Sequence, residues 1–120
     1  MKKILIVDDS EMARKSMCFS LASKRYDVLE AINGKDAVDK LRRNSDIGLV
    51  ITDLNMPEMS GLELIGYIRS SHKPSDIPVY VITTESKTGD DVMKKGATGY
   101  IVKSSKTSAE LHRVVEQHMA

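Results

Sequence analysis

Acidic side chains follow two of the most apolar runs in the chain. Asp8 and Asp9 stand directly after Ile4–Val7, and Asp53 comes two residues after the run 47–51. If these runs form neighbouring strands of a parallel sheet, their carboxyl ends meet at one edge and the three carboxylates converge there. Close carboxylates repel one another, which raises their pKa values unless a cation lies among them. An all-oxygen cluster favours a hard cation, and Mg²⁺ is typically held by one or two carboxylates with waters and phosphate oxygens.

A hydroxyl group and an ammonium group follow two further apolar runs. Thr83 comes after Val79–Ile82, and Lys103 comes after Tyr100–Val102. Carboxylates, a divalent cation, a hydroxyl and a lysine are together suited to binding a phosphoryl group and stabilising its charge. Taken alone, each of these residues is equally well explained as a helix cap, a loop residue or a solvated surface residue. The prediction of one shared site therefore rests on their joint placement at neighbouring strand ends.

The chain as a whole alternates short apolar runs with amphipathic segments. Runs rich in β-branched residues indicate strands, and apolar residues recurring every three or four positions indicate helices. Strict alternation predicts an α/β fold, a (βα)5 doubly wound five-stranded parallel sheet with helices on both faces. Runs that are apolar throughout belong in the middle of the sheet, which predicts the flavodoxin-like strand order 2-1-3-4-5. The expected strands contain residues 4–7, 28–29, 47–51, 79–82 and 100–102.

Local signals indicate where the helices begin. Asn33-Gly34 is a turn signal ahead of one helix. Ser60–Glu63 and Thr107–Glu110 both have the S/T-x-x-E pattern of a capping box, in which a side chain caps the first helical turn. A weaker helical segment is expected over 90–95, and Gly89 weakens it further because glycine costs a helix about 1 kcal/mol relative to alanine.

Composition narrows the class of protein. The chain has 120 residues, of which 41% are apolar and 29% charged, and its net charge is +1. This balance argues against a dedicated binder of nucleic acid or of a membrane surface, and no apolar run approaches the ~18 residues of a spanning helix. The lone Cys18 can form no internal disulfide and suits a reducing compartment. We expect one cytoplasmic domain over residues 1–120, without a signal peptide, a membrane segment, direct nucleic-acid binding or an effector domain.

Four stretches of the sequence, in this order and spacing, resemble the receiver domain of two-component response regulators. The combination of the acidic pair, the D-x-N-M-P-x-M-x-G segment and the distant lysine is specific, and the resemblance covers essentially the whole chain. It is most similar to single-domain, chemotaxis-type (CheY-like) regulators. The stretches are ILIVDD at 4–9, VITDLNMPEMSG at 50–61, VIT at 81–83 and GATGYIVK at 96–103.

The resemblance implies a phosphorelay role for each matching residue. Asp53 would accept a phosphoryl group from a sensor histidine kinase or a phosphotransfer protein. Mg²⁺ would be bound by the carboxylates of Asp9 and Asp53 and by the backbone carbonyl of Asn55, with Asp8 acting mainly through water. Lys103 would pair with the phosphoryl oxygens or, before transfer, with the acids.

The resemblance also implies a switch. Thr83 would hydrogen-bond the phosphoryl group, and Tyr100 would swing inward as Thr83 moves. A downstream protein target would meet the face made by the fourth helix at 90–95, the fifth strand at 100–102 and the fifth helix, which begins near Thr107. Asn55 and Glu85 would orient the water that removes the phosphoryl group. The domain would thus catalyse its own phosphotransfer and autodephosphorylation, with a short-lived phosphorylated state, and would not be an enzyme acting on a separate substrate.

Two departures from the family pattern stand out. The family usually has a proline, joined by a cis peptide, after the strand-5 lysine, whereas Ser104 follows Lys103 here. This puts in question the aim of Lys103, because a cis peptide before a residue other than proline costs about 3–4 kcal/mol. The stretch Glu85–Gly96 is about two residues shorter than in chemotaxis-type relatives.

Three alternative functions are compatible with parts of the pattern. An aspartyl-phosphate phosphatase of the haloacid-dehalogenase type also uses a strand-end aspartate, but it needs a second acid two residues on, where this chain has Asn55. A degenerate receiver that acts only as a scaffold is mildly favoured by Ser104 and opposed by the intact set of acids. A flavin-binding module of the flavodoxin type shares the fold, but no phosphate-cradling loop follows the first strand.

Overall fold

The computed structural model describes residues 2–22, 26–84 and 89–119. Within them, one parallel sheet runs in the order β2-β1-β3-β4-β5, which confirms the predicted order. Its strands β1 and β3 are neighbours although two helices and a strand separate them in the sequence. The strands are β1 Lys3–Val7, β2 Asp27–Ala31, β3 Ile47–Asp53, β4 Val79–Thr83 and β5 Gly99–Val102.

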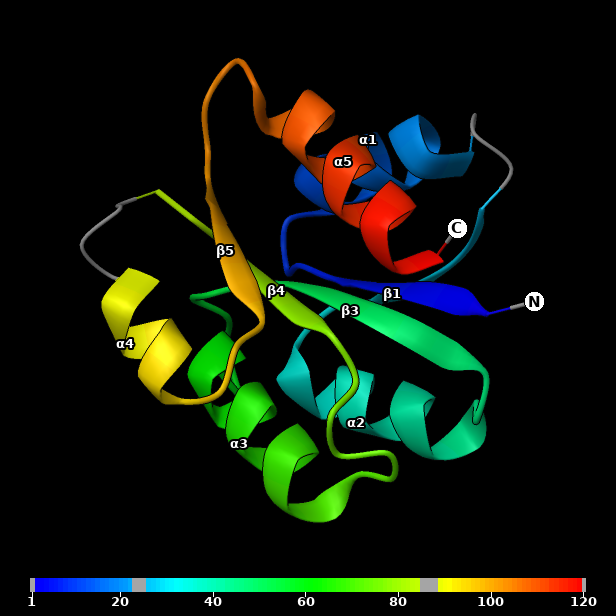
Figure 1. The fold of residues 1–120 in the computed structure, drawn as a ribbon, viewed down its shortest axis with the longest axis vertical. Helices are drawn as coiled ribbons and strands as arrows, with labels where there is room; N and C mark the ends of the chain where they lie inside the picture. The colour runs from blue at the N-terminus through cyan, green and yellow to red at the C-terminus, as the bar shows by residue number, and fades with distance from the viewer. Residues whose placement is uncertain (1, 23–25, 85–88, 120) are drawn as a thin grey trace.

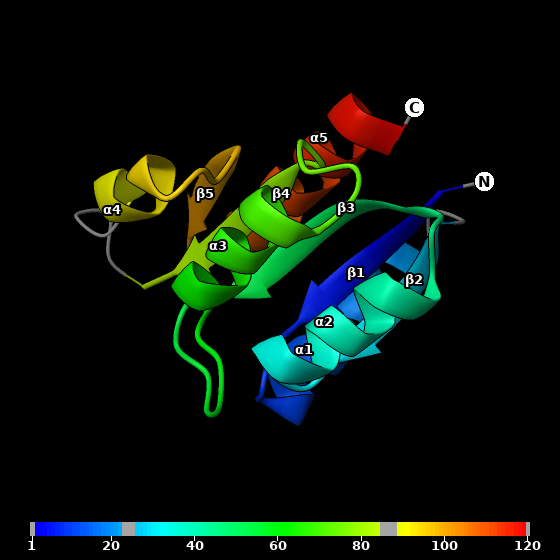
Figure 2. The same cartoon turned by 90° about the horizontal axis from the view of Figure 1, so that it is seen from below.

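Helices cover both faces of the sheet. In Figure 1, α1 and α5 lie on one side of the strands, and α2, α3 and α4 lie on the other. The view from below brings α2 and α3 in front of the sheet (Figure 2). Among the described residues, no helix is long and apolar enough to cross a bilayer. The helices are α1 Glu11–Ala22, α2 Gly34–Arg43, α3 Gly61–Ser71, α4 Gly89–Lys94 and α5 Thr107–Met119.

The central strands are apolar throughout because they are buried on both faces. Successive side chains of β1 point to opposite faces of the sheet. Ile4 and Ile6 pack with α1 and α5, whereas Leu5 and Val7 pack with α2 and α3, and all four are fully buried. By contrast, β2 and β5 lie at the edges and contain partly exposed residues, as their mixed sequences predict.

The two predicted capping boxes have different outcomes. At α3 the box is present, with the Ser60 hydroxyl accepting from the Glu63 N–H and the Glu63 carboxylate accepting from the Ser60 N–H. At α5 the prediction is wrong, because the Thr107 hydroxyl bonds backward to the N–H and C=O of Ser104. Because the Thr107 hydroxyl bonds to the preceding turn, it does not cap α5. Asn33, expected as part of a turn, caps α2 through its side chain.

Candidate functional site

The three predicted acids converge at the carboxyl ends of β1 and β3. Val7 pairs with Thr52 across these strands, so Asp8, just after β1, and Asp53, the last residue of β3, lie side by side. One carboxylate oxygen from each of Asp8, Asp9 and Asp53 lies within 4.8 Å of the others. We call these three residues together with Lys103 the acid site. Asp8 is buried, Asp53 half-buried and Asp9 exposed, so the cluster opens to solvent on one side.

Asp8 is the most constrained of the three acids. Its Oδ1 accepts from the Ser10 N–H at 2.9 Å, whereas its Oδ2 is buried without a hydrogen-bond partner. A buried carboxylate oxygen without a partner is costly unless a cation satisfies it. The oxygen-only donor set around it suits a hard divalent cation. The residues present therefore fit Mg²⁺.

The electrostatics of Asp53 support the same conclusion. Burial raises the pKa of Asp53 above its ordinary value, and the neighbouring Asp8 carboxylate raises it further, while the Lys103 ammonium acts in the opposite direction. A divalent cation among the carboxylates would offset both the burial and the repulsion. The acid site is thus arranged so that a cation favours the ionised form of Asp53.

The loop between β3 and α3 is held close to the acid site. It projects beyond the carboxyl end of the sheet and returns to α3 (Figure 2). The Gly61 N–H donates to the Leu54 carbonyl at 2.8 Å, and a Cβ at Gly61 would lie 2.5 Å from the Asp53 carbonyl oxygen. Only glycine allows this approach, because the obstacle is backbone. On the far side of the loop, the Gly34 N–H donates to the Met59 carbonyl at 3.2 Å.

Asn55 lies in this loop, two residues after Asp53, and is exposed. It therefore lies between two anchored residues of the loop: Leu54, whose carbonyl accepts from Gly61, and Met59, whose carbonyl accepts from Gly34. The role that the resemblance implies for this carbonyl as a metal ligand stays a prediction. The other residue expected to orient the dephosphorylating water, Glu85, lies outside the described residues.

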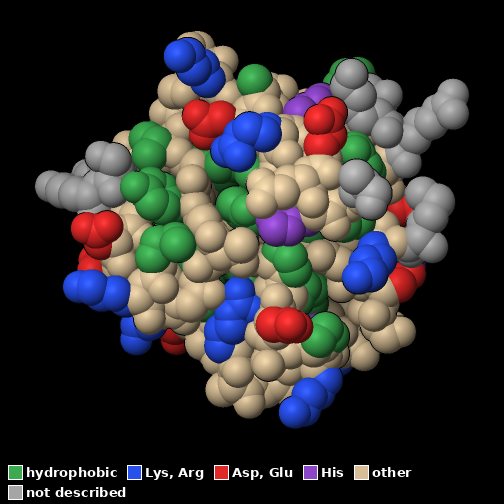
Figure 3. Space-filling model, in the orientation of Figure 1, with side chains coloured by type: hydrophobic (Ala, Val, Ile, Leu, Met, Phe, Trp, Pro, Cys, Tyr) green, Lys and Arg blue, Asp and Glu red, His purple; other side chains and the backbone are tan. Residues whose placement is uncertain are grey.

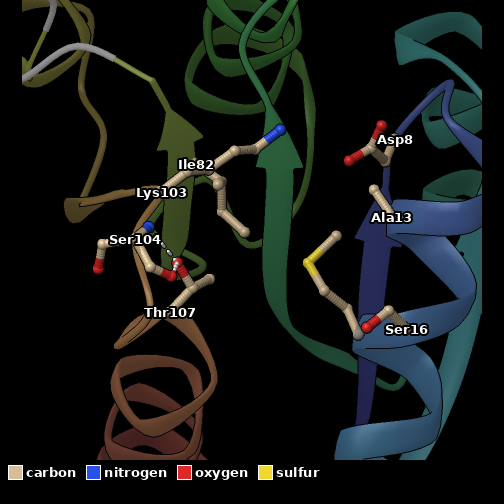
Figure 4. Close-up of a pocket in the computed structure, with 8 residues that line it drawn as sticks. Asp8, Ala13, Ser16, Ile82, Lys103, Ser104 and Thr107 are labelled. Atoms are coloured by element: carbon tan, nitrogen blue, oxygen red, sulfur yellow. Dashed lines mark hydrogen bonds between the residues drawn. The ribbon is translucent and has the colours of Figure 1, made fainter.

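Lys103 and Thr83 lie at the neighbouring ends of β5 and β4. The Lys103 N–H donates to the Thr83 carbonyl at 2.8 Å, and the Lys103 Nζ lies 3.8 Å from the Asp53 Oδ1. The Lys103 ammonium thus pairs with the Asp53 carboxylate, and its role toward a phosphoryl group stays a prediction. Thr83 is buried. Figure 4 shows Lys103 extending from the end of β5 toward Asp8 across a pocket of about 290 Å³ between α1 and α5.

The substitution of serine for proline after this lysine does not misdirect it. Among the described residues the cis peptide bond is Lys73–Pro74, so Lys103–Ser104 is trans. The lysine nevertheless reaches the carboxylate of Asp53. The turn that follows is held by hydrogen bonds between Ser104 and Thr107.

Tyr100 lies on the edge strand β5, with its ring against Gly89 of α4. A Cβ at Gly89 would lie 2.2 Å from the Tyr100 Cζ, and the side chain of Tyr100 is 38% exposed. In the space-filling view, hydrophobic side chains gather over α4 and β5 (Figure 3), where the exposed large hydrophobic residues are Met93 and Tyr100. We call this surface the α4–β5 face. The inward swing of Tyr100 stays a prediction.

The role of Gly89 differs from the one inferred from its helix propensity. Gly89 is the first residue of α4 and is buried, because it receives the Tyr100 ring. Val92 of α4 is fully buried against the sheet. The helix is as short as predicted, but these two contacts attach it to β4 and β5.

Arg14 is a site residue that the sequence did not single out. It is buried in α1, where its guanidinium donates to the Asp8 carbonyl at 2.9 Å and to the Glu30 carboxylate at 2.9 Å. It therefore fixes the backbone from which Asp8 and Asp9 extend. In the sequence, Arg14 is a charged residue directly after Ala13, which belongs to the apolar stripe of α1. An arginine exposed on the surface of the helix would give the same pattern, so the sequence did not indicate that Arg14 is buried.

Comparison with known families gives one consistent answer. The family model described as "Response regulator receiver domain" matches residues 4–116. The chain is 42% identical to the chemotaxis protein CheY homolog of Campylobacter jejuni, covering 84% of this chain and 80% of that protein. It is 43% identical to chemotaxis protein CheY1 of Helicobacter pylori, covering 84% of each chain.

Solved structures of response regulators have the same fold as this chain. Chemotaxis response regulator CheY4 of Vibrio cholerae superposes with a TM-score of 0.88 at 29% identity, covering 98% of each chain. The response regulator protein TrrA of Thermotoga maritima, solved in complex with Mg²⁺–BeF, superposes with a TM-score of 0.86 at 35% identity, again covering 98% of each chain.

Proposed function

The chain belongs to the family of response regulator receiver domains, and from that membership we propose that Asp53 accepts a phosphoryl group in a Mg²⁺-dependent transfer from a phosphohistidine. The donor is a sensor histidine kinase or a phosphotransfer protein. The observation that carries the proposal is the buried, unpartnered Asp8 Oδ2 inside a cluster of three carboxylates, with an ammonium group 3.8 Å from one of them.

Asp53 is the best placed of the three acids to act as the nucleophile. Asp8 is buried and accepts a backbone hydrogen bond, and Asp9 is exposed on the open side. An Asp53 carboxylate oxygen attacks the phosphorus, the phosphorus–nitrogen bond of the phosphohistidine breaks, and the imidazole leaves with the bonding electrons. The product on this chain is an acyl phosphate.

The other site residues bind the transferred group and the cation. Asp8, Asp9 and Asp53 would hold Mg²⁺ with the Asn55 carbonyl, and the bound ion supplies positive charge to the phosphoryl oxygens. Lys103 exchanges its pairing with Asp53 for a pairing with a phosphoryl oxygen. Thr83, at the end of β4 beside Lys103, donates its hydroxyl to another.

The phosphoryl group changes the α4–β5 face. As Thr83 moves toward the phosphoryl group, Tyr100 leaves its seat on Gly89 and turns inward, which alters the surface offered by α4, β5 and α5 to a downstream protein. The domain then removes its own phosphoryl group by hydrolysis. A cytoplasmic location is part of this proposal, since the lone Cys18 suits a reducing compartment.

The enzyme alternative is not favoured. A phosphatase of the haloacid-dehalogenase type requires an acid where this chain has Asn55, and the family model that matches is that of receivers. The scaffold alternative predicts no phosphoryl uptake, so the experiment below separates it from the proposal.

The test is incubation with a small phosphodonor such as acetyl phosphate, with and without Mg²⁺, followed by intact mass measurement and peptide mapping. The expected result is one phosphoryl group per chain, on the peptide that contains Asp53, only when Mg²⁺ is present. Asp53→Asn should abolish uptake. Asp39→Asn, which changes an exposed acid of α2, is the matched control and should not. Stoichiometric labelling of Asp53→Asn would refute the assignment.

A further inference from the structure

Ser104 is the residue through which the acid site is joined to α5. Its N–H donates to the Thr107 Oγ1 at 2.8 Å, its carbonyl accepts from the same hydroxyl at 2.9 Å, and its own hydroxyl accepts from the Lys106 N–H at 3.0 Å. Figure 4 shows the close approach of Ser104 and Thr107 at the base of the Lys103 side chain. The turn is therefore closed on itself by side chains.

This closed turn fixes one side of Lys103, and the sheet fixes the other. On the strand side, the Lys103 N–H donates to the Thr83 carbonyl. On the helix side, Thr107 is the first residue of α5, which is anchored by the buried residues Leu111 and Val114. The lysine side chain thus leaves the backbone between two fixed points and reaches to 3.8 Å from Asp53.

We propose that Thr107 is a positioning residue for Lys103: its hydroxyl, through Ser104, aims the lysine at the Asp53 carboxylate and later at the phosphoryl group. The inference rests on the proposed function. Proline at 104 has no N–H and could not make this bond. The Ser104 N–H is therefore the donor that ties the residue after Lys103 to the first residue of α5.

The experiment compares Thr107→Val, which removes the hydroxyl at constant shape, with Thr107→Ser, which retains it. Phosphorylation by acetyl phosphate is followed over a range of donor and Mg²⁺ concentrations. We expect Thr107→Val to lower the maximal rate roughly tenfold, since a small misplacement of a catalytic group is costly, and to leave the Mg²⁺ dependence unchanged. Thr107→Ser should restore the rate. Ser108→Ala, which removes the neighbouring hydroxyl bonded to Ser20, is the matched control.

A second readout does not require phosphorylation. Exchange of the Ser104 amide, measured by NMR, should be about five- to tenfold faster in Thr107→Val and unchanged in Thr107→Ser, because only the first loses the acceptor. The order parameter of the Lys103 Cε–H bonds should fall in Thr107→Val. Together these measurements show whether the hydroxyl restrains the lysine even in a chain that takes up no phosphoryl group.

The possible outcomes judge the proposed function and the positioning role of Thr107 separately. If the wild type takes up no phosphoryl group, the proposed function fails, and the amide exchange and lysine order parameter still judge the positioning. If Thr107→Val matches the wild type in rate, exchange and lysine order, the inference is overturned. It is also overturned if Thr107→Val slows the reaction further in a Lys103→Ala background, because the hydroxyl would then act without the lysine.

Discussion

The acid site and the α4–β5 face are built differently although β4 and β5 join them. The acids lie at the carboxyl ends of β1 and β3, central strands whose residues are almost entirely buried, and Arg14 holds the backbone of Asp8 in place. The α4–β5 face consists of an edge strand of four residues and a helix of six. The three carboxylates are therefore placed on the best-packed strands, and Lys103 reaches Asp53 from the end of the edge strand β5. The surface expected to change is placed where the least packing has to be broken.

A pair of glycines makes the same contrast at the level of single contacts. A Cβ at Gly61 would meet the carbonyl oxygen of Asp53, which is backbone, whereas a Cβ at Gly89 would meet the ring of Tyr100, which can rotate away. One contact is rigid and the other is movable. The predictions below test that difference, and they begin with the largest expected effect.

Gly61→Ala should destabilise the protein by about 1–3 kcal/mol, the usual cost of overpacking, because neither the loop nor β3 can yield. Urea unfolding measures the change. The control is Gly66→Ala in the middle of α3, where a Cβ meets nothing within 4 Å. This control should be stabilised by about 0.5–1 kcal/mol through helix propensity. A Gly61→Ala variant as stable as the wild type would show that the contact at Gly61 is not rigid.

Amide exchange should separate the two regions in the unphosphorylated protein. We expect α4 to exchange at least about tenfold faster than β3, because a helix of six residues attached by few contacts opens locally. Adding Mg²⁺ and beryllofluoride should increase protection across Ser86–Lys95, of which 86–88 lie outside the described residues. Equal protection of α4 before and after would argue against it as the element that switches.

Gly89→Ala should change stability by less than about 1 kcal/mol, because the gain in helix propensity offsets the loss of the Tyr100 contact. Its main effect should be on the position of the ring. Ring resonances of Tyr100 in NMR spectra should shift strongly, whereas those of Tyr80 should not. Destabilisation as large as that of Gly61→Ala would show that Tyr100 is held as firmly as the acid site.

Asp53→Asn should raise the stability of the metal-free protein slightly, by less than about 1 kcal/mol for a partly exposed, partly paired acid. Because burial raises the folded-state pKa of Asp53 above its unfolded value, this group favours folding at low pH. That contribution is lost as pH rises through the folded-state pKa. The gain should therefore be present at pH 7 in unfolding curves and vanish in acid. A gain that persists unchanged in acid would contradict the direction of the shift.

Much of the acid site was predictable from the sequence because its logic is topological. Asp8, Asp9, Asp53 and Lys103 each follow an apolar run, and a parallel sheet brings the ends of all its strands to one edge. The alternation of strands and helices determined the strand order as well, since only runs that are apolar throughout can be buried on both faces. For these features the residue type and its place after a strand were sufficient.

Tertiary structure decided the features in which one group has several possible partners. Gly89 could weaken a helix or receive an aromatic ring from another element, and it receives the ring of Tyr100 on β5. Local sequence patterns report interactions within about one helical turn. The choice among partners depends on which residues the fold brings near, as with the Arg14 guanidinium that meets the Asp8 carbonyl and Glu30 of β2. Such choices are made by packing across the sheet, and no single segment of the chain contains them.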